Sequence, residues 1–99
     1  MRRGKGPRGM TAGQAVCQTI ERLGRATGDK IFEETKGIYK WGNHTIYHYI
    51  MAQTINLWPG YHEWPGIRQE DKCLFLCSDG YFECYDQNRH GIFKDGIRI

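Results

Sequence analysis

A β-hairpin signal late in the chain constrains the fold most strongly. Two β-prone runs, residues 73–77 and 81–85, flank an Asp-Gly pair that favours a two-residue turn. If Asp79 and Gly80 form that turn, the side chains of the two strands divide between two faces. The predicted core face then holds Cys73, Phe75, Cys77, Phe82 and Cys84, with Cys77 opposite Phe82 and Phe75 opposite Cys84.

The other face of the hairpin is also too apolar to lie in water. It carries Leu74, Leu76 and Tyr85 beside Glu83. An apolar patch next to a strand edge invites aggregation, so natural sheets cover it. We therefore expect the strand-like segment 97–99 or a second protein chain to cover this face.

Two helices are predicted near the start of the chain. The first spans residues 11–23, because Thr11 and Gln14 fit a capping box and Gly24 can end a helix. The second begins at Thr27 and ends near Gly37. Apolar residues recur at helical spacing in both and predict the buried faces: Ala12, Val16, Ile20 and Leu23 in the first, and Ile31, Phe32, Thr35 and Ile38 in the second.

A third predicted helix, residues 43–58, has Asn43 as its expected N-cap and ends before Pro59. Its core face holds Ile46, Ile50, Thr54 and Leu57. Its outer strip has no carboxylate and consists of Thr45, His48, Tyr49, Ala52 and Asn56. A helix that lies against phosphates has reason to exclude acids, but a core helix with an uncharged outer face fits the same pattern.

A chain of 99 residues is expected to form one domain with a single hydrophobic core. It has no apolar run long enough to cross a bilayer, and no secretory signal is recognised at its start. These features predict a cytoplasmic protein that does not enter a membrane. In a reducing compartment its four cysteines are expected to be free thiols.

The positive charge of the chain is concentrated in its first ten residues. This segment contains Arg2, Arg3, Lys5 and Arg8, with no acid and with several glycines between the charges. We therefore expect residues 1–10 to be a disordered basic arm and residues 11–99 to be the folded domain. Such an arm either contacts phosphates or simply aids solubility.

The sequence offers little catalytic chemistry. His44 and His48 share a helical face, but the glutamate of a zinc-protease motif is missing between them. No phosphate-binding glycine loop or nucleophile motif is present, so we expect neither an enzyme nor a cofactor. A metal site made of Cys73, Cys77, Cys84 and His90 is an alternative to buried free thiols.

The order of three helices followed by a hairpin resembles the winged helix-turn-helix domain, an α+β fold. The resemblance covers residues 11–86, with residues 43–58 in the place of the recognition helix and residues 73–85 in the place of the wing. The closing segment 85–93 looks like the end of small winged-helix modules that occur alone in prokaryotes or attached to restriction-type nucleases.

This resemblance implies binding to duplex DNA, in transcription regulation or as the targeting module of a larger assembly. It implies base contacts from the start of the third helix and phosphate contacts from the residues before it. The residues concerned are Asn43, His44, Thr45, Tyr47 and His48 for the helix, and Lys36 and Lys40 before it. The tip of the hairpin carries Asp79 where such wings usually carry a cation, so no groove contact is expected there. The alternative is a protein-interaction module that binds a partner protein or a second copy of the chain through Leu74, Leu76 and Tyr85.

Overall fold

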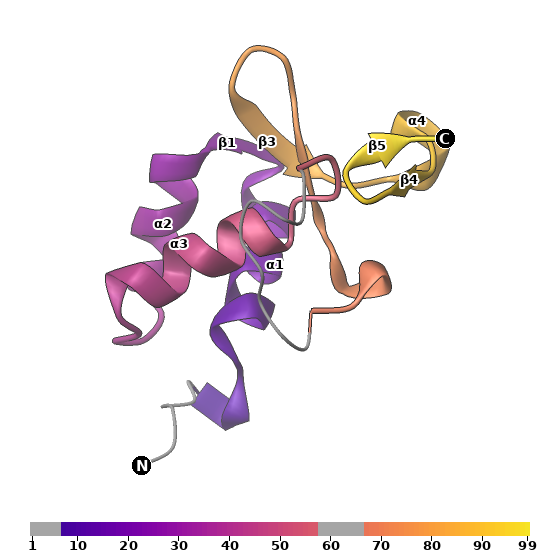
Figure 1. The fold of residues 1–99 in the computed structure, drawn as a ribbon. Coiled ribbons are helices and arrows are strands. Elements are labelled where there is room, and N and C mark those ends of the chain that lie inside the picture. Colours follow the sequence, from indigo (N-terminus) through magenta and orange to yellow (C-terminus); the bar gives the residue numbers. More distant parts are fainter. Residues whose placement is uncertain (1–6, 58–66) are drawn as a thin grey trace.

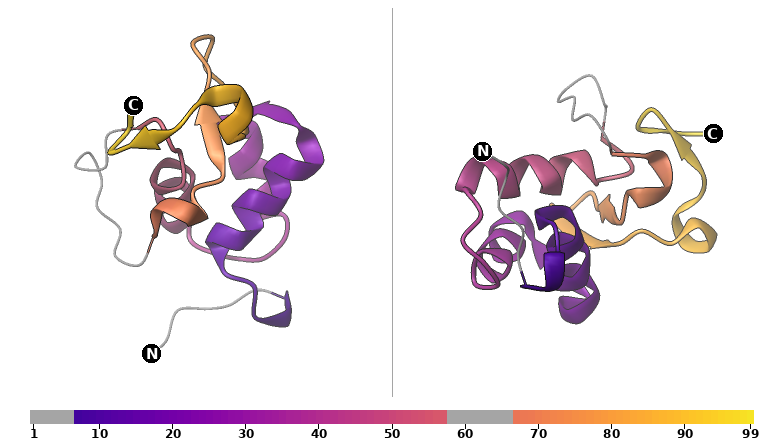
Figure 2. Two further views of the ribbon diagram at one scale, coloured as in Figure 1. Left: turned by 90° about the vertical axis from the view of Figure 1, so that its right-hand side faces the viewer. Right: turned by 90° about the horizontal axis from the view of Figure 1, so that it is seen from below.

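The computed structural model describes residues 7–57 and 67–99, which form a small α+β domain (Figure 1). The elements, in chain order, are α1 (Ala12–Leu23), β1 (Arg25–Thr27), α2 (Gly28–Lys36), α3 (Asn43–Ala52), β2 (Leu74–Leu76), β3 (Tyr81–Cys84), α4 (Gln87–His90), β4 (Phe93–Lys94) and β5 (Ile97–Arg98). Single 3-10 turns lie at Pro7–Gly9 and Gln69–Asp71. The first three helices lie on one side of β1 and β3, and the C-terminal elements lie on the other (Figures 1 and 2).

The first two helices begin where the sequence predicts. The capping box of α1 is complete, because Gln14 N donates to Thr11 Oγ1 at 3.1 Å and Thr11 N donates to Gln14 Oε1 at 2.9 Å. Thr27 caps α2 by accepting a hydrogen bond of 3.2 Å from Lys30 N. Both caps satisfy backbone N–H groups that a helix leaves unpaired in its first turn.

The third helix differs from its prediction at both ends. Gly42 occupies the N-cap, so Asn43 is the first helical residue and does not cap the helix. The helix ends at Ala52, because the following residues pair with β2 instead: Leu74 N donates to Gln53 O at 3.0 Å and Ile55 N donates to Leu74 O at 2.8 Å. A neighbouring strand thus supplies the backbone partners that a longer helix would have used. Trp58, the predicted end, lies outside the described residues.

A short strand that the sequence pattern does not predict, β1, joins the hairpin. The sheet has the order β1-β3-β2, and both pairings are antiparallel. Ala26 of β1 lies opposite Phe82 of β3 and is buried. The hairpin is therefore tied, through β1, to the connection between α1 and α2.

The predicted register of the hairpin is wrong by one residue. Cys77 N donates to Tyr81 O at 2.8 Å, which leaves a loop of three residues, Ser78, Asp79 and Gly80. Gly80 has a φ of 90°, a conformation that favours glycine. Because side chains alternate along a strand, the shift exchanges the two faces of β2, whereas Phe82 and Cys84 of β3 stay on the core side as predicted. Leu74 is consequently fully buried, and its strand neighbour Phe75 points to the outer face.

The core lies between the first three helices and the inner face of the sheet. Each of these elements contributes fully buried apolar side chains: Val16 and Ile20 from α1, Ile31 from α2, Ile46 from α3 and Leu74 from β2. Two buried hydroxyl groups also lie between α1 and α2, where Thr35 Oγ1 donates to Thr19 Oγ1 at 3.2 Å. The buried donor of this pair therefore has a partner, as burial requires.

The prediction of four free thiols is wrong. Cys17 of α1 and Cys73, which precedes β2, form a disulfide across 56 residues of sequence, with a Cα–Cα distance of 5.8 Å. Cys77 and Cys84 are free thiols. The alternative metal set is not assembled either, since the sulfur of Cys73 is committed to the disulfide. No cluster of three or more metal-binding side chains occurs within residues 7–57 and 67–99.

The chain itself covers the outer face of the hairpin, although not with the segment that was predicted. His90 of α4 stacks on Phe75, with ring centroids 4.0 Å apart, and Phe93 lies 5.8 Å from the same ring. Ile97 and Ile99, the expected cover, are 63% and 76% exposed. An aromatic cluster therefore takes the place of the expected aliphatic strand.

Candidate nucleic-acid interface

The outward face of α3 carries no charge. None of the ten residues from Asn43 to Ala52 is acidic or basic, apart from two histidines. Asn43, His44 and Tyr47 are exposed, and Thr45 and His48 are half-buried beside them. The five predicted contact residues of the helix therefore lie in its first two turns, and three of them are open to a partner.

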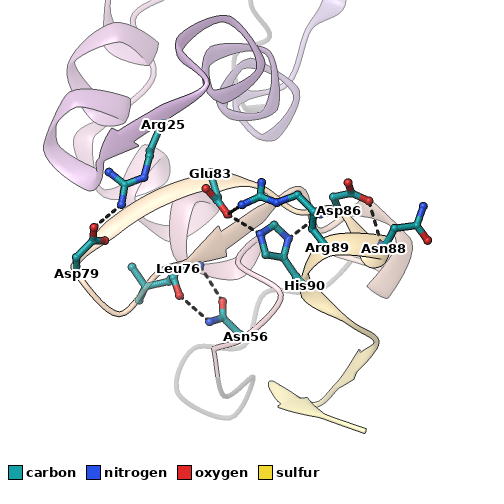
Figure 3. A network of polar contacts seen from close by, with 9 residues as sticks. All are labelled: Arg25, Asn56, Leu76, Asp79, Glu83, Asp86, Asn88, Arg89 and His90. Carbon is teal, nitrogen blue, oxygen red and sulfur yellow. Dashed lines mark hydrogen bonds and ion pairs between the residues drawn. The ribbon is translucent and has the colours of Figure 1, made fainter.

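The predicted outer strip is correct only in part. Ala52 is 5% exposed and belongs to the interior. Tyr49 packs over Gly13 of α1, where a β-carbon would lie 2.9 Å from the tyrosine ring. Asn56 is not helical, and its side chain pairs with the backbone of Leu76 in both directions, at 2.8 and 2.9 Å (Figure 3). The open face is therefore centred on the exposed residues near the start of the helix.

The aromatic rings of this face contact other rings, and Tyr47 is stacked. The ring of Tyr47 stacks on Phe32 of α2, with centroids 4.4 Å apart and planes 4° from parallel, and Tyr47 remains 41% exposed. His44 and His48 lie one turn apart, with ring centroids separated by 4.2 Å. Stacked rings lose little further freedom when a partner binds, which favours recognition.

Lys36 braces the connection between α2 and α3. Its Nζ donates to Trp41 O at 3.0 Å and to Asn43 Oδ1 at 2.5 Å. One acceptor lies in the connection just before α3 and the other is the first residue of the helix, so the ammonium group fixes the helix entry. Lys40, in the same connection, is exposed. The sequence placed both lysines beside α3 but gave no sign that one of them has this internal role.

The tip of the hairpin is less acidic than its sequence suggests. Asp79 forms an ion pair with Arg25 of β1 (Figure 3). The Arg25 guanidinium also lies 4.5 Å from the ring centroid of Tyr81. A hydrogen bond from Tyr81 N, followed by the one from Arg25, lowers the pKa of Asp79 from its ordinary value. Arg25 therefore neutralises the acid, an outcome that depends on the unpredicted strand β1.

A second polar cluster lies on the outer face of the sheet (Figure 3). Glu83 Oε2 lies 2.5 Å from His90 Nε2 and accepts a hydrogen bond of 2.9 Å from Arg89. His90 Nδ1 accepts from Asp86 N at 3.0 Å, which leaves Nε2 as the protonated nitrogen. The His90 hydrogen bond lowers the pKa of Glu83. Because both ring nitrogens are engaged, this histidine is built to attach α4 rather than to move a proton.

The basic arm is mostly outside the described part of the chain. Arg2, Arg3 and Lys5 lie in residues 1–6, and the side chain of Arg8 is likewise not described. The described portion begins with the turn at Pro7–Gly9, after which Met10 N donates to Pro7 O at 3.1 Å. Met10 packs against the core, so the chain enters the domain beside the start of α1.

No helix in residues 7–57 or 67–99 is long and apolar enough to span a membrane. No protein-family model, curated protein or solved structure matches the chain. The arrangement of its own residues is therefore the basis for a functional proposal.

Proposed function

We propose that the protein is a winged-helix DNA-binding domain that places α3 in the major groove. The order α1-β1-α2-α3-β2-β3, with β1 hydrogen-bonded to β3, supports this fold assignment. In such domains the second helix of a helix-turn-helix enters the groove and the hairpin flanks it. In this chain α2 and α3 are that helix pair, and the loop at Asp79 is the tip of the wing.

The observation that carries the proposal is the uncharged, exposed face of α3. A carboxylate near duplex DNA is repelled by closely spaced phosphates, whereas amide, imidazole and phenol groups can approach the base edges. His44 and Tyr47 present such groups on the open side of the helix, and Thr45 and His48 border them. Asn43 is exposed as well, but its Oδ1 accepts from Lys36, so only its amide N–H groups are offered to a base. The groove of B-DNA is wide enough to admit an α-helix with these side chains.

The phosphate contacts of the proposal come from cations around this face. Lys40 is exposed next to the helix entry, and Lys36 uses two of its three N–H donors internally, so its predicted phosphate contact has one donor left. Because Arg25 is paired with Asp79, the wing adds little net charge. Most of the salt-dependent affinity should therefore come from the arm, which carries Arg2, Arg3, Lys5 and Arg8.

Fluorescence anisotropy with labelled random duplex DNA, at several salt concentrations, tests the proposal. The intact protein should bind, and deletion of residues 2–9 should flatten the slope of log K against log salt by about 3 to 4. His48→Ala or Thr45→Ala should leave that slope unchanged. Each variant should reduce the difference in binding free energy between selected and random sites, by roughly 1 to 3 kcal/mol for each base-edge interaction removed. If neither the intact nor the arm-deleted protein binds duplex DNA at low salt, the DNA-binding proposal is refuted.

A protein-interaction module remains the second candidate, but on a different surface. Leu74 is buried within its own chain and cannot contact a partner. Within residues 7–57 and 67–99, the exposed large aliphatic residues lie instead in the C-terminal segment, where Ile92, Ile97 and Ile99 are 50%, 63% and 76% exposed. Sedimentation equilibrium of the wild type and Ile97→Ser would detect self-association through this segment, including the homodimer that the sequence left open.

A further inference from the structure

An open groove of about 960 Å³ runs along α1, and its lining extends from Pro7 and Met10 to Glu21. Its lining includes Cys17 and Glu21 of α1, together with Gln53, Arg68 and Asp71 from other parts of the chain. Residues four apart on a helix are neighbours, so the Glu21 carboxylate lies one turn from the Cys17 sulfur. One half of the Cys17–Cys73 disulfide thus faces an open space.

Gln53 fixes the position of the Cys17 sulfur. Its Nε2 donates to Cys17 Sγ at 3.4 Å and to Asp71 O at 3.2 Å. The second bond also assigns the amide orientation, because a backbone carbonyl can only accept. Gln53 is 4% exposed, and its backbone carbonyl accepts from Leu74 N. A buried side chain therefore holds the half-buried sulfur at the wall of the groove.

We propose that Cys17 is a thiol-exchange site, which takes small neutral or cationic thiols from the groove. A thiolate attacks Cys17 Sγ, a new sulfur–sulfur bond forms to Cys17, and the Cys17–Cys73 bond breaks. The electron pair of the broken bond leaves with Cys73, whose thiolate then takes a proton from water. The products are a mixed disulfide on Cys17 and a free thiol on Cys73, with no net oxidant or reductant beyond the incoming thiol.

The preference for neutral or cationic thiols follows from the charges of the groove. Among its described lining residues, Glu21 and Asp71 are acidic and Arg68 is the basic one. Arg68 is already engaged by Asp71 at 3.1 Å and by Glu70 at 3.5 Å. The Glu21 carboxylate is left to act on the incoming reagent. It attracts an ammonium group and repels a carboxylate.

The chain's own thiols are poor competitors for this reaction. Burial is the largest cause of the raised pKa of both Cys77 and Cys84, and nearby carboxylates add to it. A raised pKa leaves little thiolate near neutral pH, and the thiolate is the attacking species. Cys77 also lies in the hairpin beside the loop Ser78–Gly80, away from the groove lining. Exchange is therefore expected with an external thiol.

The test measures exchange on the intact, air-oxidised protein with cysteamine, 2-mercaptoethanol and 3-mercaptopropionate. After acid quench and alkylation, peptide mapping should place the first adduct on Cys17 and the alkyl group on Cys73. The cysteamine-to-mercaptopropionate rate ratio should fall severalfold in Glu21→Gln at low ionic strength, because removing one negative charge slows the cationic reagent and speeds the anionic one. Glu33→Gln, on the exposed side of α2, is the matched control and should leave the ratio unchanged.

Exchange through the groove should also be insensitive to low urea, because no unfolding is needed, whereas exchange through global opening accelerates steeply with denaturant. First adducts on Cys73, an equal change of ratio in both glutamate variants, or a rate that follows global unfolding would each overturn the proposal. So would the recovery of Cys17 and Cys73 as free thiols from air-oxidised protein.

Discussion

The outward face of α3 and the outer face of the hairpin differ in what the chain itself lays over them. The hairpin face is closed by α4, through the stack of His90 on Phe75 and the hydrogen bonds to Glu83. The α3 face carries aromatic and polar side chains as well, but His44 and Tyr47 point outward and remain exposed.

This contrast shows that polar chemistry alone does not identify a site. Glu83 and His90 form the tighter and more buried group, with side chains only 13% and 6% exposed, yet their hydrogen-bonding capacity is largely used within the chain. On the α3 face, Asn43, His44 and Tyr47 are exposed. The accessible surface is therefore the better candidate for recognition.

The largest effect should come from opening the closed face. His90→Ala removes a hydrogen bond to an ionised carboxylate and an aromatic stack, and should lower the free energy of unfolding by about 2 kcal/mol. The matched control is His44→Ala, an exposed histidine, which should change it by less than about 0.5 kcal/mol. Urea unfolding of the two variants makes the comparison, and equal effects would show that the α4 attachment is not stabilising.

A smaller effect is expected where the open face begins. Lys36→Met removes two hydrogen bonds at the entry to α3 while keeping most of the side-chain volume. It should lower the free energy of unfolding by about 1 to 2 kcal/mol. Lys40→Met, an exposed lysine in the same connection, is the control and should be near neutral. Backbone amide exchange should rise at the start of α3 in the Lys36 variant alone. Unchanged amide protection at the start of α3 in the Lys36 variant would show that Lys36 does not brace the helix entry.

The smallest effect is the pH dependence of the closed face. The pKa of Glu83 lies below its ordinary value of 4.5, with the His90 hydrogen bond as the first cause. Its contribution to stability is therefore fully present above about pH 4.5 and is lost as the pH falls through the lowered pKa. The stability difference between wild type and His90→Ala should shrink between about pH 5 and pH 3. If the stability difference between wild type and His90→Ala grows as the pH falls over this range, the hydrogen bond from His90 is not what stabilises the ionised Glu83.

Local patterns predicted the first two helices well. The capping box at Thr11 and the cap at Thr27 depend on residues three positions apart, so the sequence shows both partners together. The buried positions Val16, Ile20 and Ile31 likewise follow from a helical repeat within one element. Interactions of this kind need no knowledge of the rest of the fold.

Contacts between distant segments account for the errors. The end of α3 depends on pairing between Ile55 and Leu74, and the disulfide joins Cys17 to Cys73. The register of the hairpin depended on a choice between two and three loop residues, and Ser78-Asp79-Gly80 is compatible with both. No local pattern reports such pairings. For the candidate site, composition indicated the uncharged face of α3. The internal role of Lys36 could not be predicted, because its acceptors are identified only by the folded structure.

The most direct test of the DNA-binding proposal is a titration of isotope-labelled protein with a random duplex, followed by two-dimensional NMR at low salt. We expect the largest amide shift changes at Asn43, His44, Tyr47 and His48, with Lys40 beside them, and little change at Glu83 and His90. Changes confined to the basic arm, or centred on the C-terminal segment around Ile97, would contradict the proposal that α3 reads DNA.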